Sequence, residues 1–74
     1  KDGAIVFFDK NDTNINKAGI FALRSRGGIF IKRVFLGIDG SVELISQNSI
    51  YPPERVDIDE IFIIGRVLGT IERV

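Results

Sequence analysis

The stretch GGIFIKRVF, from Gly27 to Phe35, sets two adjacent cations among isoleucine, valine and phenylalanine. Its β-branched and aromatic residues are typical of a β-strand. Successive side chains of a strand point to opposite faces, so Lys32 and Arg33 face opposite sides of the sheet. Whichever face is the core, one of the two cations starts out pointing toward it.

Turn signals on both sides of this stretch predict two hairpins. The sequence SRGG at 25–28 separates it from the apolar run GIFALR at 19–24, and Asp39-Gly40 precedes SVELIS at 41–46, which alternates polar and apolar residues. Asp-Gly suits the positive φ angles of a tight hairpin turn. We therefore expect consecutive strands at 19–24, 29–36 and 41–46.

Apolar runs near both ends of the chain predict two further strands. The run AIVFF at 4–8 follows Asp2-Gly3 and predicts a buried strand. The run IFIIGRVLGTI at 61–71 predicts a last long strand, with Gly65 and Gly69 at bends or bulges. Val56 is expected to pair only briefly.

Polar or irregular segments separate these strands. DKNDTNINKA at 9–18 lacks hydrophobic periodicity and predicts an exposed loop, while the two prolines of QNSIYPPER at 47–55 oppose regular pairing. We expect Tyr51 to pack over the rigid corner that these prolines form, and 57–60 to be an acidic turn. With no helix of useful length, the sequence predicts one all-β domain over 1–74. It should hold five or six mainly antiparallel strands in a curled sheet or partial barrel.

The composition argues against several classes of function. Ten Lys and Arg balance ten Asp and Glu, which is unlike a nucleic-acid-binding surface and gives no attraction to an anionic membrane. Cysteine and histidine are absent from the sequence, so common metal ligands and the commonest general base are missing, and we expect no metal or cofactor. No apolar run approaches the roughly 18 residues that span a bilayer. The acidic group Asp57, Asp59 and Glu60 lacks the spacing of a calcium loop and is interpreted as a solvated turn.

The cation that faces the core has two interpretations. A long basic side chain near solvent can extend its charged end outward, which requires no function. Alternatively, a lysine is held in an apolar setting for chemistry, because full burial lowers a lysine pKa by up to about 3–5 units and a neutral amine is a competent general base. Such an amine takes the proton of a serine hydroxyl without any histidine. Alternation alone leaves open which of the two cations turns inward.

Four segments, in order and spacing, resemble the C-terminal domain of LexA-like and phage CI-like repressors, a family that shares its fold with type I signal peptidases. They are KDGAIVFFD at 1–9, GIFALRSRGGIFIKRV at 19–34, DGSVELISQNSIYPPERVD at 39–57 and FIIGRVLGTI at 62–71, which together cover essentially the whole chain. The most specific parts are the hydrophobic-Lys-Arg core of the hairpin and the NSIYPP turn. The resemblance implies a LexA/signal-peptidase-like fold.

The resemblance assigns the general base to Lys32 and gives Arg33 no catalytic role. The family's nucleophilic serine lies in a Ser-Met segment before the Asp-Gly that matches Asp2-Gly3. We therefore expect it to precede Lys1, in a longer protein of which this chain is a fragment, with the self-cleavage dipeptide further upstream. Ala18-Gly19 is interpreted as structural. The remaining serines are interpreted as turn residues rather than nucleophiles: Ser25, Ser41, Ser46 and Ser49.

Two expectations concern the surroundings of charged side chains. The Lys32 stem should lie against Phe30, Val34 and the first strand, while Arg33 reaches solvent. Arg66, in the last strand, is expected to form a surface ion pair or to face a partner subunit. Its expected partners are the acidic residues of the nearby turn: Asp57, Asp59 and Glu60.

The resemblance implies the C-terminal dimerisation and regulatory domain of a phage-type transcriptional repressor, located in the cytoplasm. DNA would be bound by an N-terminal helix-turn-helix domain of the parent protein. Self-association through the strand at 61–71 would bring two such domains onto paired half-sites. That strand is apolar on both faces, and a domain this small has little interior for the second face. Relatives also perform serine/lysine self-cleavage, which the RecA filament stimulates.

Two alternative functions stay open from the sequence. One is a serine/lysine peptidase of the signal-peptidase type that acts on other proteins, and the other is a non-catalytic β-barrel binding module. The residues before Lys1 distinguish them. A Ser-Met segment there supports a peptidase-type domain, and a helix-turn-helix further upstream supports the repressor.

Overall fold

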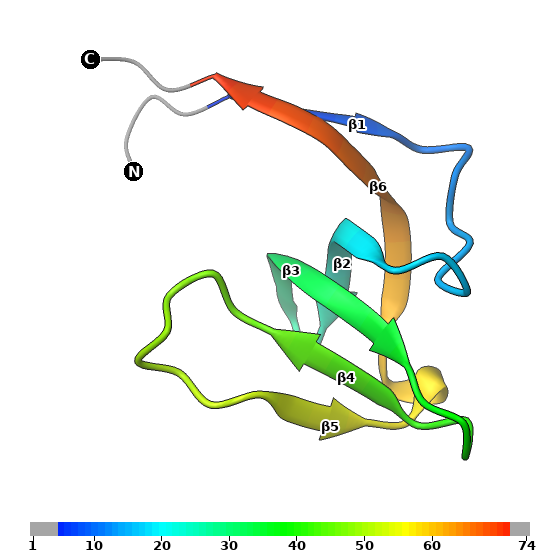
Figure 1. Cartoon of the computed structure of the whole chain (residues 1–74). Coiled ribbons are helices and arrows are strands. Elements are labelled where there is room, and N and C mark those ends of the chain that lie inside the picture. Colours follow the sequence, from blue (N-terminus) through cyan, green and yellow to red (C-terminus); the bar gives the residue numbers. More distant parts are fainter. Residues whose placement is uncertain (1–4, 72–74) are drawn as a thin grey trace.

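The computed structural model describes residues 5–71, which form one six-stranded sheet with every neighbouring pair antiparallel. The strand order is β1-β6-β2-β3-β4-β5. The strands are β1 (Ile5–Asp9), β2 (Gly19–Ser25), β3 (Gly28–Leu36), β4 (Val42–Ile45), β5 (Glu54–Val56) and β6 (Phe62–Ile71), and a 3₁₀ turn, η1, spans Ile58–Glu60. Figure 1 shows a curled sheet that stays open, with β1 and β5 at its edges.

The predicted all-β, antiparallel curled sheet is confirmed, and most strand boundaries agree within one residue. The predicted brief pairing at Val56 is the end of β5, and the acidic turn at 57–60 contains η1. The Asp2-Gly3 turn and the expected strand start at Ala4 lie outside the described residues.

The two hairpins form because their turn residues accept the backbone angles that a tight turn requires. Arg26 and Gly27 link β2 to β3 with φ angles of 51° and 81°, the double positive φ that matches the twist of the flanking strands. In the β3–β4 turn, Gly40 has a φ of 87°. The Asp39 carboxylate accepts hydrogen bonds from the Ser41 backbone N–H at 3.0 Å and from the Ser41 hydroxyl at 2.7 Å. Both turns predicted from the sequence are therefore present.

The core lies on the concave side of the curled β2–β5 segment of the sheet. Alternate residues of four strands contribute apolar side chains that are fully or almost fully enclosed: Phe21, Leu23, Val34, Val42, Leu44 and Val56. Ile15, Ile61 and Ile63 pack against this cluster from the loop and from β6. Because side chains alternate along β3, the face that carries Val34 also carries Lys32 and Phe30.

Strand β6 changes partners along its length. Residues Phe62 to Arg66 pair with β2, whereas Arg66 to Ile71 pair with β1. The register shifts once in each half, leaving Ile64 and Leu68 unpaired, so the bulges predicted at the two glycines lie one residue before each of them. Figure 1 shows β1 and the C-terminal half of β6 leaving the rest of the sheet as a two-stranded ribbon, here called the β1–β6 ribbon, made of residues 5–9 and 67–71.

Gly65 is required where β1 crosses onto β6. A Cβ atom at this position would lie 2.5 Å from the Asp9 carbonyl oxygen and 2.8 Å from a ring carbon of Phe8. Such contacts are too short for any side chain to occupy. The absence of a side chain at Gly65 therefore allows the β1 backbone to pair with β6 at the point where the ribbon begins.

The corner at 47–53 is built differently from our prediction. The Asn48 side-chain oxygen accepts a hydrogen bond from the Ile50 backbone N–H at 3.2 Å, and the Asn48 carbonyl accepts one from Tyr51 N–H at 3.1 Å. Tyr51 is 58% exposed, so it does not pack over the prolines as expected. Backbone and asparagine hydrogen bonds shape this corner in place of tyrosine packing.

Candidate functional site

Lys32 lies in the middle of β3 on the core face, directly opposite Phe21 of β2. Its side chain is half-buried, whereas Arg33 points to the other face and is exposed. The enclosed neighbours Phe21 and Val34 account for this difference, because they surround the base of the Lys32 side chain with apolar surface. The structure thus places the lysine, rather than the arginine, toward the core.

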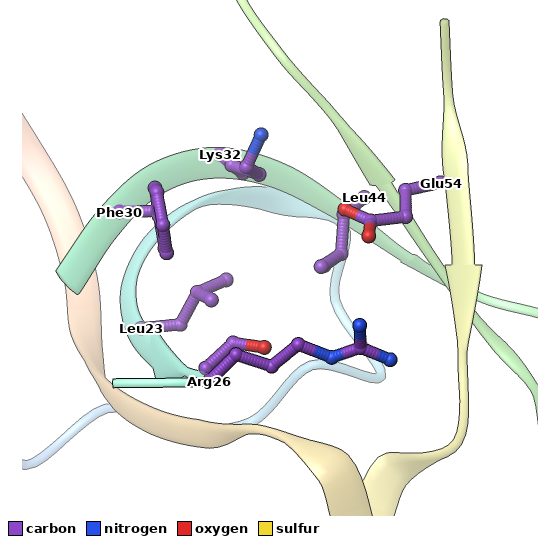
Figure 2. Close-up of a pocket in the computed structure, with 7 residues that line it drawn as sticks. Leu23, Arg26, Phe30, Lys32, Leu44 and Glu54 are labelled. Carbon is purple, nitrogen blue, oxygen red and sulfur yellow. The ribbon is translucent and has the colours of Figure 1, made fainter. Parts of the chain in front are cut away.

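A pocket of about 130 Å³ opens beside Lys32. Its floor is apolar, formed by Leu23, Leu44 and Phe30, and its rim carries charged groups of both signs from Arg26 and Glu54. The lining residues are Leu23, Ser25, Arg26, Phe30, Lys32, Leu44 and Glu54. Figure 2 shows Phe30 and Lys32 along one side and Arg26 along the opposite side, with the lysine amine directed away from Leu23.

The Lys32 amine lies over an aromatic ring and has no acidic partner among residues 5–71. Its nitrogen is 5.6 Å from the centre of the Phe30 ring, within the range of a cation–π contact. None of the ion pairs formed by the described side chains includes Lys32. The described side chains therefore leave the Lys32 amine without a carboxylate partner.

The prediction that the Lys32 stem would contact the first strand is wrong. β1 is separated from β3 by β6 and β2 in the strand order. The neighbours that line the pocket with Lys32 come instead from β2, β4 and β5. The prediction of packing beside Phe30 and on the Val34 face agrees with the structure.

Three of the described serines lie at a turn or at the end of a strand: Ser25, Ser41 and Ser46. Ser25 lines the same pocket but pairs with Gly28, which lies four positions before Lys32 along β3, a distance of about 13 Å. The Ser41 hydroxyl donates to Asp39, and the Ser46 hydroxyl accepts a hydrogen bond from Asn48 N–H at 3.2 Å. These serines have the turn and strand-end positions predicted for them.

Arg66 forms a second polar cluster on the core face of the sheet, which the sequence did not predict. Its Nε donates to the Asp12 carboxylate at 2.8 Å, and its terminal nitrogens donate to three backbone carbonyls of the β1–β2 loop. Those carbonyls belong to Asn14, Lys17 and Ala18, at 3.0, 3.1 and 3.3 Å. The guanidinium also lies 4.5 Å above the centre of the Phe21 ring. We call this arrangement the Arg66 clamp.

The predicted pairing of Arg66 with the acidic turn is therefore wrong. Glu60 lies six residues before Arg66 along an extended chain, which is about 20 Å away. Glu60 instead approaches Arg26, at 3.9 Å between exposed side chains. The β1–β2 loop returns to β6, and the Arg66 backbone N–H donates to the Asp12 carbonyl at 2.9 Å. Topology thus brings a residue 54 positions away closer than the neighbouring turn.

A comparison with protein families matches residues 1–68 of this chain to the family described as Peptidase S24-like. The chain belongs to the Peptidase S24-like family. The match spans β1 to β5 and most of β6, so Lys32 and the Arg66 clamp both lie inside it. It confirms the resemblance to the C-terminal domains of LexA-like and phage CI-like repressors. A search of curated proteins finds no match to the chain.

The described residues of this Peptidase S24-like domain offer neither a metal site nor a membrane-spanning helix. Across positions 5–71, no three acidic, histidine or cysteine side chains gather closely enough to hold a metal ion. Over the same positions, no helix has the length and apolar character needed to cross a bilayer.

The Arg66 clamp also makes the stability of the Peptidase S24-like domain depend on pH. The hydrogen bond from Arg66 lowers the pKa of the Asp12 carboxyl below its usual 3.8, and the Asn14 backbone N–H lowers it further. Because the pKa is lower in the folded state, the ionised carboxylate stabilises the fold above pH 3.8, the usual carboxyl value. This contribution is lost as the pH falls through the lowered pKa.

Proposed function

We propose that the chain is the C-terminal dimerisation and regulatory domain of a phage-type transcriptional repressor that cleaves itself by serine/lysine chemistry. The observation that carries the proposal is Lys32, half-buried beside an apolar pocket in a Peptidase S24-like domain. Recognition of DNA is assigned to an N-terminal helix-turn-helix domain of the parent protein. The zero formal charge of this chain supports that division of roles.

In this proposal Lys32 acts as the general base toward a serine that lies upstream of Lys1 in the parent. The neutral amine accepts the hydroxyl proton while the serine oxygen forms a bond to the carbonyl carbon of the scissile peptide. The C–N bond then breaks, and the leaving amine takes the proton back from the lysine ammonium. Water then bonds to the ester carbonyl carbon while the lysine amine accepts its proton, the C–O bond to the serine breaks, and the lysine ammonium returns the proton to the serine oxygen. Glu54 and Arg26 at the rim carry no role in these steps.

The parent protein with its upstream segment tests the proposal. We expect it to cleave itself at a rate that rises with pH, since only the neutral form of an amine accepts a proton. Lys32→Ala should slow cleavage by about 10²–10⁴-fold, the usual contribution of a general base. Arg33→Ala is the matched control and should cleave at the wild-type rate, because Arg33 points to the opposite face. The rates are measured by gel densitometry and by the intact mass of the products.

The 74-residue chain supplies a further control. Incubated alone at about pH 10, where an amine base is favoured, it should retain its intact mass because the proposed nucleophile lies upstream of Lys1. A specific internal cut that Lys32→Ala abolishes would contradict the assignment of the nucleophile. Equal cleavage of the wild-type and Lys32→Ala parents would contradict the role of the lysine.

We also propose that two copies associate through β6. The ribbon exposes Leu68 at 69%, Ile71 at 52% and Phe7 at 49% of their surface. Residues 67–71 of β6 pair with β1 alone, so their other edge presents free backbone donors and acceptors. A twofold dimer covers both features with the same surface from a second copy.

Sedimentation equilibrium of the chain and of two variants tests this dimer. Leu68→Asp places a charge in the proposed interface and should leave the protein monomeric, whereas the wild-type chain dimerises. Ile38→Asp is the control, because Ile38 is fully exposed in the β3–β4 turn, away from the ribbon. A wild-type chain that is still monomeric at hundreds of micromolar, or an Ile38→Asp variant that dissociates as readily as Leu68→Asp, would contradict association through β6.

A further inference from the structure

β1 and the loop that follows it contribute little to the core of the domain. None of the five residues of β1 is buried. The enclosed side chains of the core come from β2, β3, β4 and β5, and in the loop at 10–18 it is Ile15 that packs against them. Release of residues 5–18 would therefore uncover little enclosed apolar surface, whereas release of β2, β3 or β4 would open the core.

β1 is held to the sheet through a single neighbouring strand. It pairs with β6 and lies at the edge of the sheet (Figure 1). Residues Phe62 to Arg66 of β6 pair with β2 whether or not β1 is in place. If β1 leaves, the sheet from this half of β6 to β5 keeps its strand pairings, whereas residues 67–71 of β6 lose the one strand among those described with which they pair.

The Arg66 clamp joins residues 5–18 to the rest of the domain. The guanidinium donates to the Asp12 carboxylate and to the carbonyls of Asn14, Lys17 and Ala18, and the Arg66 backbone N–H donates to the Asp12 carbonyl at 2.9 Å. The Arg66 side chain is 17% exposed, so most of this arrangement is shielded from water. Hydrogen bonds that involve a charged group are about twice as strong as neutral ones. One residue of β6 thus provides the main polar attachment of the loop.

Hydrogen bonds within the loop connect it to the end of β1. The Asn11 backbone N–H donates to the Asp9 carboxylate at 2.9 Å, and the Asp12 N–H donates to the Asp9 carbonyl at 3.1 Å. Further along, the Asn14 N–H donates to the Asp12 carboxylate at 3.3 Å, and the Asn16 N–H donates to the Asn14 side chain at 3.0 Å. These are successive turns in which a side chain accepts from the backbone two residues on. Because they run without interruption from β1 into the loop, the two should move together.

We infer that residues 5–18 form a strap that opens as one unit, and that the Arg66 clamp is its latch. In the open form β2, β3, β4, β5 and residues 62–66 of β6 stay paired, and residues 67–71 lack a partner among the described strands. Even a two-stranded ribbon is only marginally stable alone, so a single extended strand is not. The β1–β6 ribbon, on which the proposed dimer depends, therefore exists only while the strap is closed. The inference itself requires neither that dimer nor a role for Lys32.

Hydrogen exchange of the 74-residue chain tests the strap, measured residue by residue by NMR at concentrations where the chain sediments as a monomer. The Arg66 backbone N–H is the decisive probe, because it belongs to β6 but donates to Asp12 in the strap. In the wild-type chain it should exchange with the same opening free energy as the protected amides of β1. Both should exchange at least about 10-fold faster than the most protected amides of β3 and β4, as expected for opening below the global level.

Asp12→Asn removes the charge from the latch and keeps the shape of the side chain. Exchange of the residue 66 N–H and of the strap amides should rise together by about 10-fold, because charge assistance is lost, while β3 and β4 stay unchanged. Arg66→Met removes the whole latch and should raise exchange by about 10²-fold. Asp39→Asn is the matched control. Asp39 also accepts a backbone N–H two residues on, from Ser41, and approaches Arg55 at 3.9 Å, but it lies in the β3–β4 turn, so strap exchange should keep its wild-type rate.

Three results would overturn the inference. The first is a wild-type strap as well protected as β3. The second is unequal acceleration of the residue 66 N–H and the β1 amides in Asp12→Asn, which would show that β1 frays residue by residue. The third is acceleration in Asp12→Asn that is absent from the strap or shared equally by β3 and β4. The wild-type and Asp12→Asn chains decide among these outcomes even if Arg66→Met does not fold, and none of them bears on Lys32.

Discussion

Replacement of Gly65 by alanine is expected to remove about 3 kcal/mol of folding free energy, near the upper end for an overpacked site. The added methyl would lie 2.5 Å from the Asp9 carbonyl oxygen and 2.9 Å from its carbonyl carbon. Both are backbone atoms, so no side-chain rotation relieves the collision and β1 must move off β6. At 0.05–0.15 kcal/mol per residue, a chain of 74 residues has roughly 4–11 kcal/mol in total. The variant should therefore lose a large part of its stability, measured by urea unfolding monitored by circular dichroism.

Gly69→Ala is the matched control in the same strand. Gly69 also pairs with β1, but a Cβ atom there meets no other atom within 4 Å. We expect a change within about 0.5 kcal/mol, and the reduced freedom of the unfolded chain favours a small gain. Equal losses in the two variants would show that β1 docking does not depend on the close approach at Gly65.

The strands of this fold were predictable because their signals are local. Alternation of side chains and the turn chemistry of Arg26-Gly27 and Asp39-Gly40 act over a few residues, and the β2–β3–β4 hairpins follow from them. The order of the sheet was not predictable in the same way. β6 pairs with β2 and β1, whose paired residues lie 38 to 66 positions earlier in the chain. No local pattern specifies such a partner.

The candidate site was likewise predictable only where its signals are local. Alternation showed that one cation of the Lys32-Arg33 pair faces the core, and the family resemblance selected Lys32, which the structure places on that face. The Arg66 clamp was missed because the nearest acids in sequence were taken as partners. The available signals were an arginine beside Gly65 in an apolar strand and a loop rich in Asn and Asp. These signals indicate that the Arg66 guanidinium needs hydrogen-bond acceptors. They do not indicate which loop of the chain folds back to supply them.

The two polar features of the core face share one apolar residue. Phe21 lies beneath the Arg66 guanidinium and opposite Lys32, and its own surface is fully enclosed. A hydrophobic side chain thus keeps both cations at defined positions on one face, although neither forms hydrogen bonds with it. Any variant at this position changes the core, the clamp and the surroundings of the amine together.

Phe21→Ala should consequently be the most destabilising single truncation in the core. Loss of a fully buried phenylalanine costs about 3–5 kcal/mol, and loss of the aromatic face beneath Arg66 adds about 0.5–2 kcal/mol for a partly desolvated cation–π contact. Against a total of roughly 4–11 kcal/mol for a chain of 74 residues, the variant should be substantially unfolded in water at 25 °C. Urea unfolding and the dispersion of amide signals in NMR spectra measure this directly.

Phe62→Ala is the control for Phe21→Ala. It removes a phenylalanine ring that lies beside an arginine at the surface, so it separates the cost of losing this contact from the cost of losing a buried side chain. Phe62 is 58% exposed, and the Arg24 guanidinium lies 5.1 Å from its ring centre, so it forms the same kind of contact at the surface. Because little apolar area is lost, we expect a cost of about 1 kcal/mol or less. If both phenylalanine truncations cost the same, the enclosed position of Phe21 would not be the source of its effect. A large loss of folding free energy in Phe21→Ala alone would show that the stability of the domain depends on the buried residue that lies between Arg66 and Lys32.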